Sequence, residues 1–258
     1  MTDDARPESR TDLSSETLAL LANRVSVRRF TDDAVTDAHV DAILRAAIRA
    51  PTSSNLQAYS VIVVRDADVK RRIAEITDGQ RHVAECPVYL QFCADLTRME
   101  AALKRHGRDL EDNNLECGLV ASIDASLVGM AAYMAADSLG IKGVMIGAVR
   151  NDPVEIGRLL GLPRRVYPVF GMCLGWPAKD YRQKPRLDLG ATVHREKYDQ
   201  SRSEAELDDY DARLADHYRS LKRPTTADSW TRMVAEKFAE PRRDMLRAQL
   251  KEMGFDFR

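Results

Sequence analysis

The chain has 258 residues, of which 44% are hydrophobic and 31% are charged, and its formal net charge at pH 7 is −1. This length and composition allow one large domain or two small ones around a packed core. The near-zero net charge excludes a global field that would attract nucleic acid or anionic lipid, so any bound anion must be held by a local cluster of cations. We therefore expect no nucleic-acid or membrane partner.

The cysteines and the N-terminus bear on the cellular compartment. None of the four cysteines forms a C-x-x-C pair and no two histidines have zinc-ligand spacing, so we expect free thiols and no metal site. Residues 1–12 are polar, are expected to be disordered, and lack the apolar stretch of a secretory signal. The expected compartment is reducing, namely the cytoplasm.

Apolar periodicity and turn residues predict a succession of helices and strands. A helix is expected near 13–21, with Ser14 or Ser15 as its cap, and a second between Thr36 and Pro51. Nearly continuous apolar runs predict buried strands at 60–64, 88–93, 143–149 and 167–175. Further helices are expected at 66–77, after residue 93 to about 106, and at 115–139, 153–160, 203–220 and 228–252. Residues 79–83 are expected to form a polar turn.

The order of these elements predicts the domain organisation. Four strands alternate with helices, which indicates an α/β layout. The sequence has no internal repeat and no change in composition sharp enough to mark a second core. We expect one main domain at 13–200 and a helical extension at 201–258 that packs on the same domain.

The long helix expected at 115–139 is rich in small residues at spacings of three and four. Such spacing favours close contact between helices, in the core or across a dimer interface. In a fully apolar helix the same pattern is found in membranes, but Asp124 and Asp137 argue against that interpretation.

The segment Arg24-Val25-Ser26-Val27-Arg28 alternates polar and apolar side chains. In an extended backbone the two guanidiniums and the hydroxyl lie on one face, and the valines lie on the other. Two guanidinium forks around a hydroxyl suit a phosphate dianion. A solvated edge strand with surface arginines is the alternative, because exposed arginines are common.

A second polar stretch, at residues 51–57, links a helix to a strand and reads Pro-Thr-Ser-Ser-Asn-Leu-Gln. It is either a turn or a cradle for a planar polar heterocycle or a ribityl-like chain. The chain has no dinucleotide G-x-G-x-x-G, P-loop or G-x-S-x-G motif, and its five histidines suggest no catalytic dyad. A strong core without an acid–base set suggests a bound cofactor that supplies the chemistry.

These two stretches together resemble the FMN-dependent nitroreductase superfamily. Five further motifs in the same order resemble one subgroup, the oxygen-insensitive NADPH nitroreductases and flavin reductases: residues 79–83, 92–95, 143–151, 171–177 and 184–187. The resemblance runs from about residue 20 to 200. It implies an α+β fold with a mainly antiparallel central sheet flanked by helices, and an intertwined homodimer with FMN at its interface.

The resemblance also implies roles for individual residues. The FMN phosphate would be held by Arg24, Ser26, Arg28, Lys184 and Arg186. The ribityl chain and the ring would be contacted by Thr52, Ser53, Ser54, Asn55, Gln57 and Gln80, with the backbone of Ile146, Gly147 and Ala148 near the ring edge. Lys222 and Arg223 stand where relatives bind the 2′-phosphate of NADPH, so the hydride donor is NADPH or NADH.

The implied activity is a ping-pong transfer of a hydride from NAD(P)H to nitroaromatics, quinones or free flavin. No side chain is required as a catalytic acid or base, because the chemistry takes place on FMN. One alternative is a reductase dedicated to a single acceptor or to a partner monooxygenase. Another, of a different class, is a flavin-binding module without enzymatic activity.

Overall fold

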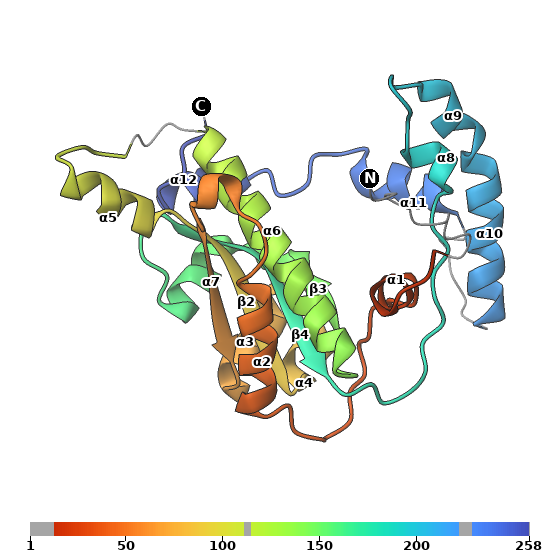
Figure 1. The fold of residues 1–258 in the computed structure, drawn as a ribbon, viewed down its shortest axis with the longest axis horizontal. Coiled ribbons are helices and arrows are strands. Elements are labelled where there is room, and N and C mark those ends of the chain that lie inside the picture. The colour runs from red at the N-terminus through yellow and green to blue at the C-terminus, as the bar shows by residue number, and fades with distance from the viewer. Residues whose placement is uncertain (1–12, 111–114, 222–228, 258) are drawn as a thin grey trace, which may run out of the picture. The chain divides into compact units, whose positions relative to one another are not determined.

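The computed structural model describes residues 13–110, 115–221 and 229–257 (Figure 1). It divides into two compact units. The first comprises the described residues up to Tyr181 together with those from Arg247 onwards, and the second is Arg182–Leu246. The expected division between residues 200 and 201 stays a prediction.

A four-stranded antiparallel sheet forms the centre of the first unit. Its strands are β1 (Tyr59–Val64), β2 (Val88–Asp95), β3 (Lys142–Ile146) and β4 (Val166–Gly175), in the order β1-β2-β4-β3. The α+β fold with an antiparallel sheet is thereby confirmed. The α/β layout is wrong, because alternation of elements along a chain does not set the direction of neighbouring strands.

Position in the sheet decides how far each strand is buried. The central strands β2 and β4 are buried along their whole lengths, as their apolar runs predict. Strand β1 lies at one edge and is only partly buried, and Val63 is 40% exposed. The prediction of a buried strand at 60–64 is therefore wrong, since an apolar run does not distinguish an edge from a centre.

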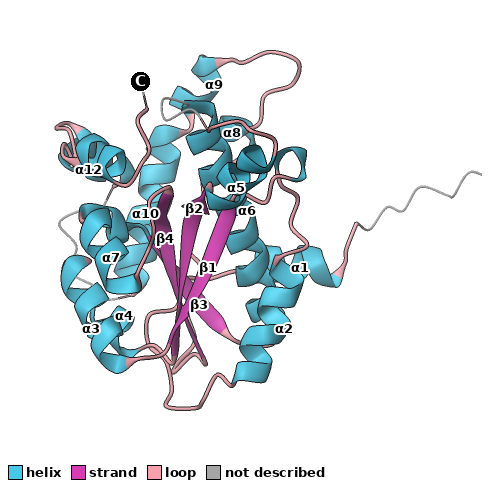
Figure 2. Ribbon diagram, turned by 90° about the vertical axis from the view of Figure 1, so that its left-hand side faces the viewer, coloured by secondary structure: helices cyan, strands magenta, loops and turns pink. Residues whose placement is uncertain are grey.

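Helices cover both faces of the sheet, and Figure 2 shows the sheet edge-on between them. One face carries α2 (Asp37–Ala47) and α6 (Leu115–Ser138). The other carries α3 (Ala67–Ile76), α4 (Arg81–Glu85) and α7 (Pro153–Leu160). The remaining elements of this unit are α1 (Glu16–Ala22), α5 (Thr97–Arg105), α12 (Leu246–Glu252) and two 3₁₀ turns, Ser53–Asn55 and Gly147–Asn151.

The helix boundaries follow from capping residues in the sequence. Ser15 accepts a hydrogen bond from Leu18 N at the start of α1, and Thr36 forms a capping box with His39 at the start of α2. Both caps confirm the expected helix starts. The turn expected at 79–83 is wrong in part, because residues from Arg81 onwards enter the short helix α4.

Helix α6 packs its small residues against the sheet. By length and composition it resembles a membrane span, with a mean hydropathy of 1.6 in its most apolar window. Its buried residues nevertheless face other elements of the unit and include Asp124 and Asp137. At Gly129 an added Cβ atom would lie 2.3 Å from Cζ of Phe170, so only glycine lets α6 approach β4 this closely. This burial supports the core-helix interpretation.

The described residues of the second unit form four helices: α8 (Leu189–Thr192), α9 (Gln200–Ala205), α10 (Leu207–Ser220) and α11 (Trp230–Phe238). Asp211 of α10 accepts hydrogen bonds from the backbone N–H groups of Trp230 and Thr231, at 2.6 and 3.1 Å, which ties α10 to the start of α11. One continuous helix at 228–252 is wrong, because Pro241 follows the end of α11 and cannot continue it.

We predict that Gly129→Ala lowers the free energy of unfolding by about 1–2 kcal/mol. Overpacking at a 2.3 Å approach to Phe170 costs about 2–3 kcal/mol, in the upper part of the usual range, and the higher helix propensity of alanine offsets about 1 kcal/mol of it. Denaturant unfolding measures the change. Ser126→Ala, at an exposed site of the same helix, is the control and should shift stability by less than about 0.5 kcal/mol. Equal stability of Gly129→Ala and the native chain would contradict this packing.

Candidate functional site

The segment that carries Arg24, Ser26 and Arg28 is extended but lies outside the sheet. Its only β pairing is an isolated bridge between Phe30 and Pro177. Val27 is fully buried and its N–H donates to the carbonyl of Gly143, at 2.9 Å. The alternative of an edge strand is therefore wrong, because the segment is extended but is not part of the sheet.

Tyr133 of α6 fixes the backbone of this segment by a hydrogen bond. Its hydroxyl donates to the carbonyl of Val25 and to that of Gly143, and the latter bond is 3.2 Å. The guanidinium of Arg24 lies over the Tyr133 ring, 5.5 Å from the centroid. Burial raises the pKa of Tyr133, the positive charge of Arg24 partly offsets this effect, and the hydroxyl stays protonated as a donor.

The two arginines of this segment have no carboxylate partner among the residues that the structure describes. Arg24 Nη1 lies 3.4 Å from Ser26 Oγ, so the two polar groups share one face. Arg28 is exposed, and its backbone N–H donates to the Tyr181 hydroxyl at 3.4 Å. Two unpaired guanidiniums and a hydroxyl on one face fit an anion.

The 51–57 stretch is fixed by a carboxylate that the sequence did not single out as functional. Asp124 of α6 is fully buried, and its two oxygens accept the N–H groups of Ser53 and Ala58, at 3.0 and 3.1 Å. One side chain thus holds both ends of the stretch. A lone Asp within an apolar helix was the available sequence signal, because a buried carboxylate needs hydrogen-bond donors.

Within the stretch the backbone takes an unusual course. Ser54, Asn55 and Gln57 have φ values of 48°, 57° and 52°, a region that side chains other than glycine seldom adopt. Thr52 Oγ1 accepts the N–H of Gln57 at 3.3 Å. Among the described residues the hydroxyls of Ser53 and Ser54 have no hydrogen-bond partner. The stretch therefore presents exposed hydroxyls on a backbone held in a conformation that residues other than glycine seldom adopt.

Arg98 of α5 secures the exit of the loop. Its Nη2 donates to the carbonyls of Gln57, at 2.9 Å, and Tyr59. Its Nη1 lies 3.2 Å from the carboxylate of Asp95. Burial alone would raise the pKa of Asp95, but hydrogen bonds from Ser60 and Thr97, together with Arg98, lower it overall. The carboxylate therefore remains charged and keeps Arg98 in place.

The remaining predicted residues of the first unit lie at ends of secondary structure. Gln80 immediately precedes α4, and within the described chain its side-chain amide has no partner. The side chain of Ile146 is buried, so only its backbone is available to a ligand. Gly147 and Ala148 follow in a 3₁₀ turn, where a Cβ added to Gly147 would lie 3.4 Å from Arg150 Nη2.

In the second unit, side chains of α10 bind the backbone of the irregular segment Lys184-Pro185-Arg186. Arg213 Nη1 donates to the carbonyl of Arg186 at 3.1 Å, and Tyr210 donates to that of Pro185 at 3.2 Å. Neither Lys184 nor Arg186 pairs with a carboxylate in the described part of the chain. Their meeting with Arg24 and Arg28 at one phosphate stays a prediction. Lys222 and Arg223 lie outside the described residues.

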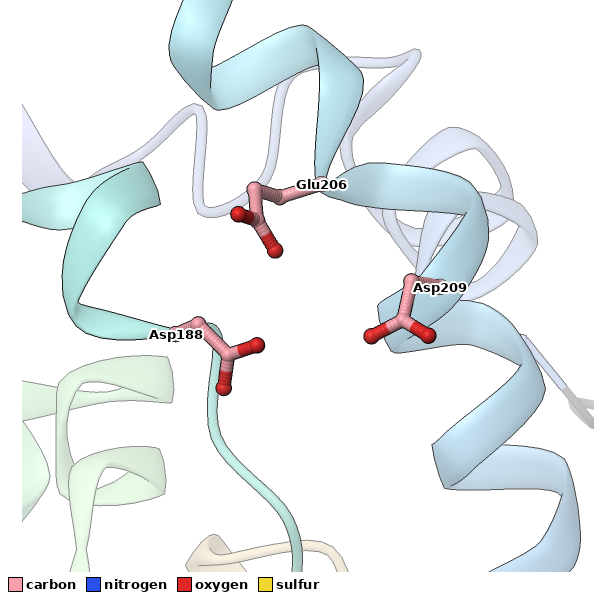
Figure 3. Close-up of side chains that lie close together, drawn as sticks. All are labelled: Asp188, Glu206 and Asp209. Atoms are coloured by element: carbon pink, nitrogen blue, oxygen red, sulfur yellow. The ribbon is translucent and has the colours of Figure 1, made fainter.

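Three carboxylates of the second unit also lie close together (Figure 3). Asp188, Glu206 and Asp209 have oxygens within 4.8 Å of one another. Arg213 accounts for their proximity, because its guanidinium lies 3.2 Å from Asp188 and 2.8 Å from Asp209. A solvated ion-pair network therefore explains the cluster without a metal ion.

Helix α6 sets the spacing between the two polar segments of the first unit. Tyr133 holds the arginine segment and Asp124 holds the 51–57 loop, and nine positions separate them. At 1.5 Å per residue this is about 14 Å along the helix axis.

Comparison with known proteins gives consistent matches over nearly the whole chain. The model of the nitroreductase family matches residues 21–176, and that of the C-terminal domain of the nitroreductase family matches 184–258. An oxygen-insensitive NADPH nitroreductase of Salmonella typhimurium is 36% identical over 93% of this chain and 98% of its own. An FMN reductase (NAD(P)H) of Bacillus subtilis is 34% identical over the same shares, 93% and 98%. The solved structure of B. megaterium NfrA2 has a TM-score of 0.91 at 33% identity and covers 95% of this chain and 100% of that one.

We predict that Asp124→Asn lowers the free energy of unfolding by about 1–3 kcal/mol, because an amide leaves one buried N–H of the 51–57 loop without an acceptor. Denaturant unfolding measures the loss. Glu116→Gln makes the same change of charge at an exposed site of α6 and should cost less than about 1 kcal/mol. If both variants lose the same stability, Asp124 does not hold the loop.

Proposed function

The chain belongs to the nitroreductase family, and we propose that it is an FMN-dependent oxidoreductase that transfers a hydride from NAD(P)H to a small electron acceptor. The observation that carries the proposal is that Arg24 and Arg28, beside Ser26, have no carboxylate partner among the described residues, on a segment that Tyr133 fixes to the core. Relatives of this chain are named as an NADPH nitroreductase and an FMN reductase. They span nearly its whole length, so the activity concerns the entire chain.

The residues of the first unit fit the phosphate of FMN. A phosphate monoester carries a charge of about −1.5 to −2 at pH 7 and three acceptor oxygens. Arg24 and Arg28 supply positive charge and parallel N–H donors, and Ser26 supplies a hydroxyl. We propose that Lys184 and Arg186 add to this charge.

The hydroxyls and amides of the 51–57 loop are proposed to bind the ribityl chain and the ring. Ser53, Ser54 and Asn55 offer donors and acceptors, and Asp124 and Arg98 keep the loop in one conformation. Gln80 and the backbone of 146–148 are proposed to lie at the ring edge. Bound FMN supplies hydride chemistry, so the side chains need only bind and orient.

The acceptors we propose are nitroaromatics, quinones or free flavin, in a ping-pong sequence. A reductase dedicated to one acceptor or to a partner monooxygenase is the second candidate, because one relative is named an FMN reductase. For the donor we propose NADPH ahead of NADH, with Lys222 and Arg223 at its 2′-phosphate. The four free cysteines support a reducing compartment, the cytoplasm.

The direct test is the colour of the purified protein and its response to a hydride donor. We expect a yellow protein whose visible absorption is lost within seconds of adding NADPH or NADH without oxygen. A yellow protein that neither nucleotide bleaches would be a flavin-binding module and would overturn the enzymatic proposal. A protein that binds no FMN would overturn both.

We also propose that the chain forms a homodimer with FMN at its interface. Four large apolar side chains form an exposed stripe on α6: Leu115, Leu119, Ile123 and Leu127. Such a continuous stripe is unfavourable in water and fits a protein partner.

We predict that Arg28→Ala weakens FMN binding by about 10- to 150-fold, the equivalent of one charge-assisted contact of about 1.5–3 kcal/mol. Fluorescence titration of apoprotein with FMN measures the effect. Arg29→Ala removes the same charge from the next residue, which faces the opposite side of an extended segment, and should change affinity less than about twofold. Equal losses in both variants would contradict the phosphate assignment.

We predict that Ile123→Lys converts the dimer to a monomer, since a charged side chain disrupts an apolar interface. Light scattering after size exclusion measures the mass. Ala102→Lys, at an exposed site of α5, should leave the dimer intact. A native chain that is monomeric at micromolar concentration, or a variant that dimerises as tightly as the native chain, would refute the interface.

A further inference from the structure

His82 has a buried nitrogen that the proposed function does not yet use. It lies on α4, two residues after Gln80, and its ring is half-buried. Its Nε2 atom is inaccessible to solvent and has no hydrogen-bond partner among the described residues. Buried polar atoms in folded proteins are nearly always paired, so an unpaired one points to a missing ligand or a role in function.

The stretch of chain after the arginine segment lies next to the stretch after α4. Phe30 and Pro87 come from the two neighbouring stretches of chain and meet at Gly175, where an added Cβ atom would lie 2.7 Å from Phe30 and 2.8 Å from Pro87. Arg28 is two residues before Phe30, and α4 ends two residues before Pro87. The two stretches of chain therefore lie side by side, and the charge of Arg28 acts on the His82 ring.

The charges around His82 are mostly positive. Burial lowers the pKa of His82, the charge of Arg28 lowers it further, and Glu85 acts in the opposite direction. Glu85 is itself paired with Arg81 on the same helix. From α3, the buried Lys70 reaches the end of α4 and donates to the carbonyl of Cys86 at 2.5 Å. From β4, the thiol of Cys173 is protonated, because burial raises its pKa.

We propose that His82 is a proton-linked member of the phosphate site: when a phosphate dianion binds at Arg24, Ser26 and Arg28, His82 takes up one proton from solvent. Its imidazolium then adds a positive charge to the site. The inference rests on the proposed function, because it requires FMN at the arginine segment. It concerns only the imidazole and the anion, and no electron is transferred.

The direction of the linkage follows from the charges. Without an anion, burial and Arg28 keep the pKa of His82 below its ordinary value, so the ring is neutral at pH 7. A dianion beside Arg28 offsets that positive charge and favours the imidazolium, which raises the pKa. Between the two pKa values FMN binding takes up a proton, so affinity increases as pH falls, by up to about tenfold per pH unit.

The test is calorimetric titration of apoprotein with FMN at pH 7, in two buffers of different ionisation enthalpy. We expect proton uptake on binding to the native chain, and a several-fold gain in affinity from pH 8 to pH 6.5. His82→Gln should show neither. This variant also controls for the phosphate of FMN. That group has its own pKa near 6 and contributes equally to the titrations of the native chain and of the variant. Riboflavin, which has no phosphate, should bind without proton uptake.

Pairs of results separate this inference from the proposed function. If FMN binds to the native chain with no proton uptake, or if His82→Gln takes up as many protons, the inference is wrong and the FMN function stands. If FMN does not bind to the native chain, both are wrong. Should His82→Gln fail to fold, NMR titration of the assigned His82 ring replaces it: a pKa that does not rise when FMN binds would overturn the inference.

Discussion

Two buried polar side chains on one apolar helix hold the irregular backbone on which the candidate site depends. Asp124 and Tyr133 lie in the core of the first unit, where an unpaired carboxylate or hydroxyl costs several kcal/mol. Both are satisfied by backbone groups of segments outside the sheet: the 51–57 loop for Asp124, and the arginine segment for Tyr133. Because these bonds are buried, neither segment is free to relax into a simpler turn or a strand.

The site also leaves positive charge without an internal partner. The side chains of Arg24 and Arg28 share one side of an extended segment, and their mutual repulsion is not offset by any carboxylate within the described residues. Some exposed arginines elsewhere in the structure do pair with a carboxylate, as Arg71 does with Asp68 and Arg81 with Glu85. Two arginines gathered at one hydroxyl support an external anion as their partner, and His82 extends the same deficit of negative charge into the interior.

Sequence reasoning recovered most of the elements because apolar periodicity and caps are local signals. Ser15 and Thr36 cap their helices as expected, and the central strands coincide with the apolar runs. Strand direction and the exposure of β1 were not accessible, because both depend on which strands become neighbours. The supporting residues were missed for a similar reason: the partners of Asp124 are 66 and 71 residues away in the sequence. The spacing of residues 24–28 alone left two interpretations open, a phosphate site and a surface strand. Only the resemblance to a family identified FMN as the cofactor.

The central claim is that the arginine segment binds the phosphate group of FMN. Fluorescence titration of the apoprotein with FMN and with riboflavin compares two ligands that differ only in that group. If Arg24 and Arg28 each form a charge-assisted contact of about 1.5–3 kcal/mol, FMN should bind at least about 100-fold more tightly than riboflavin at low salt. Equal affinities for the two flavins would contradict the account.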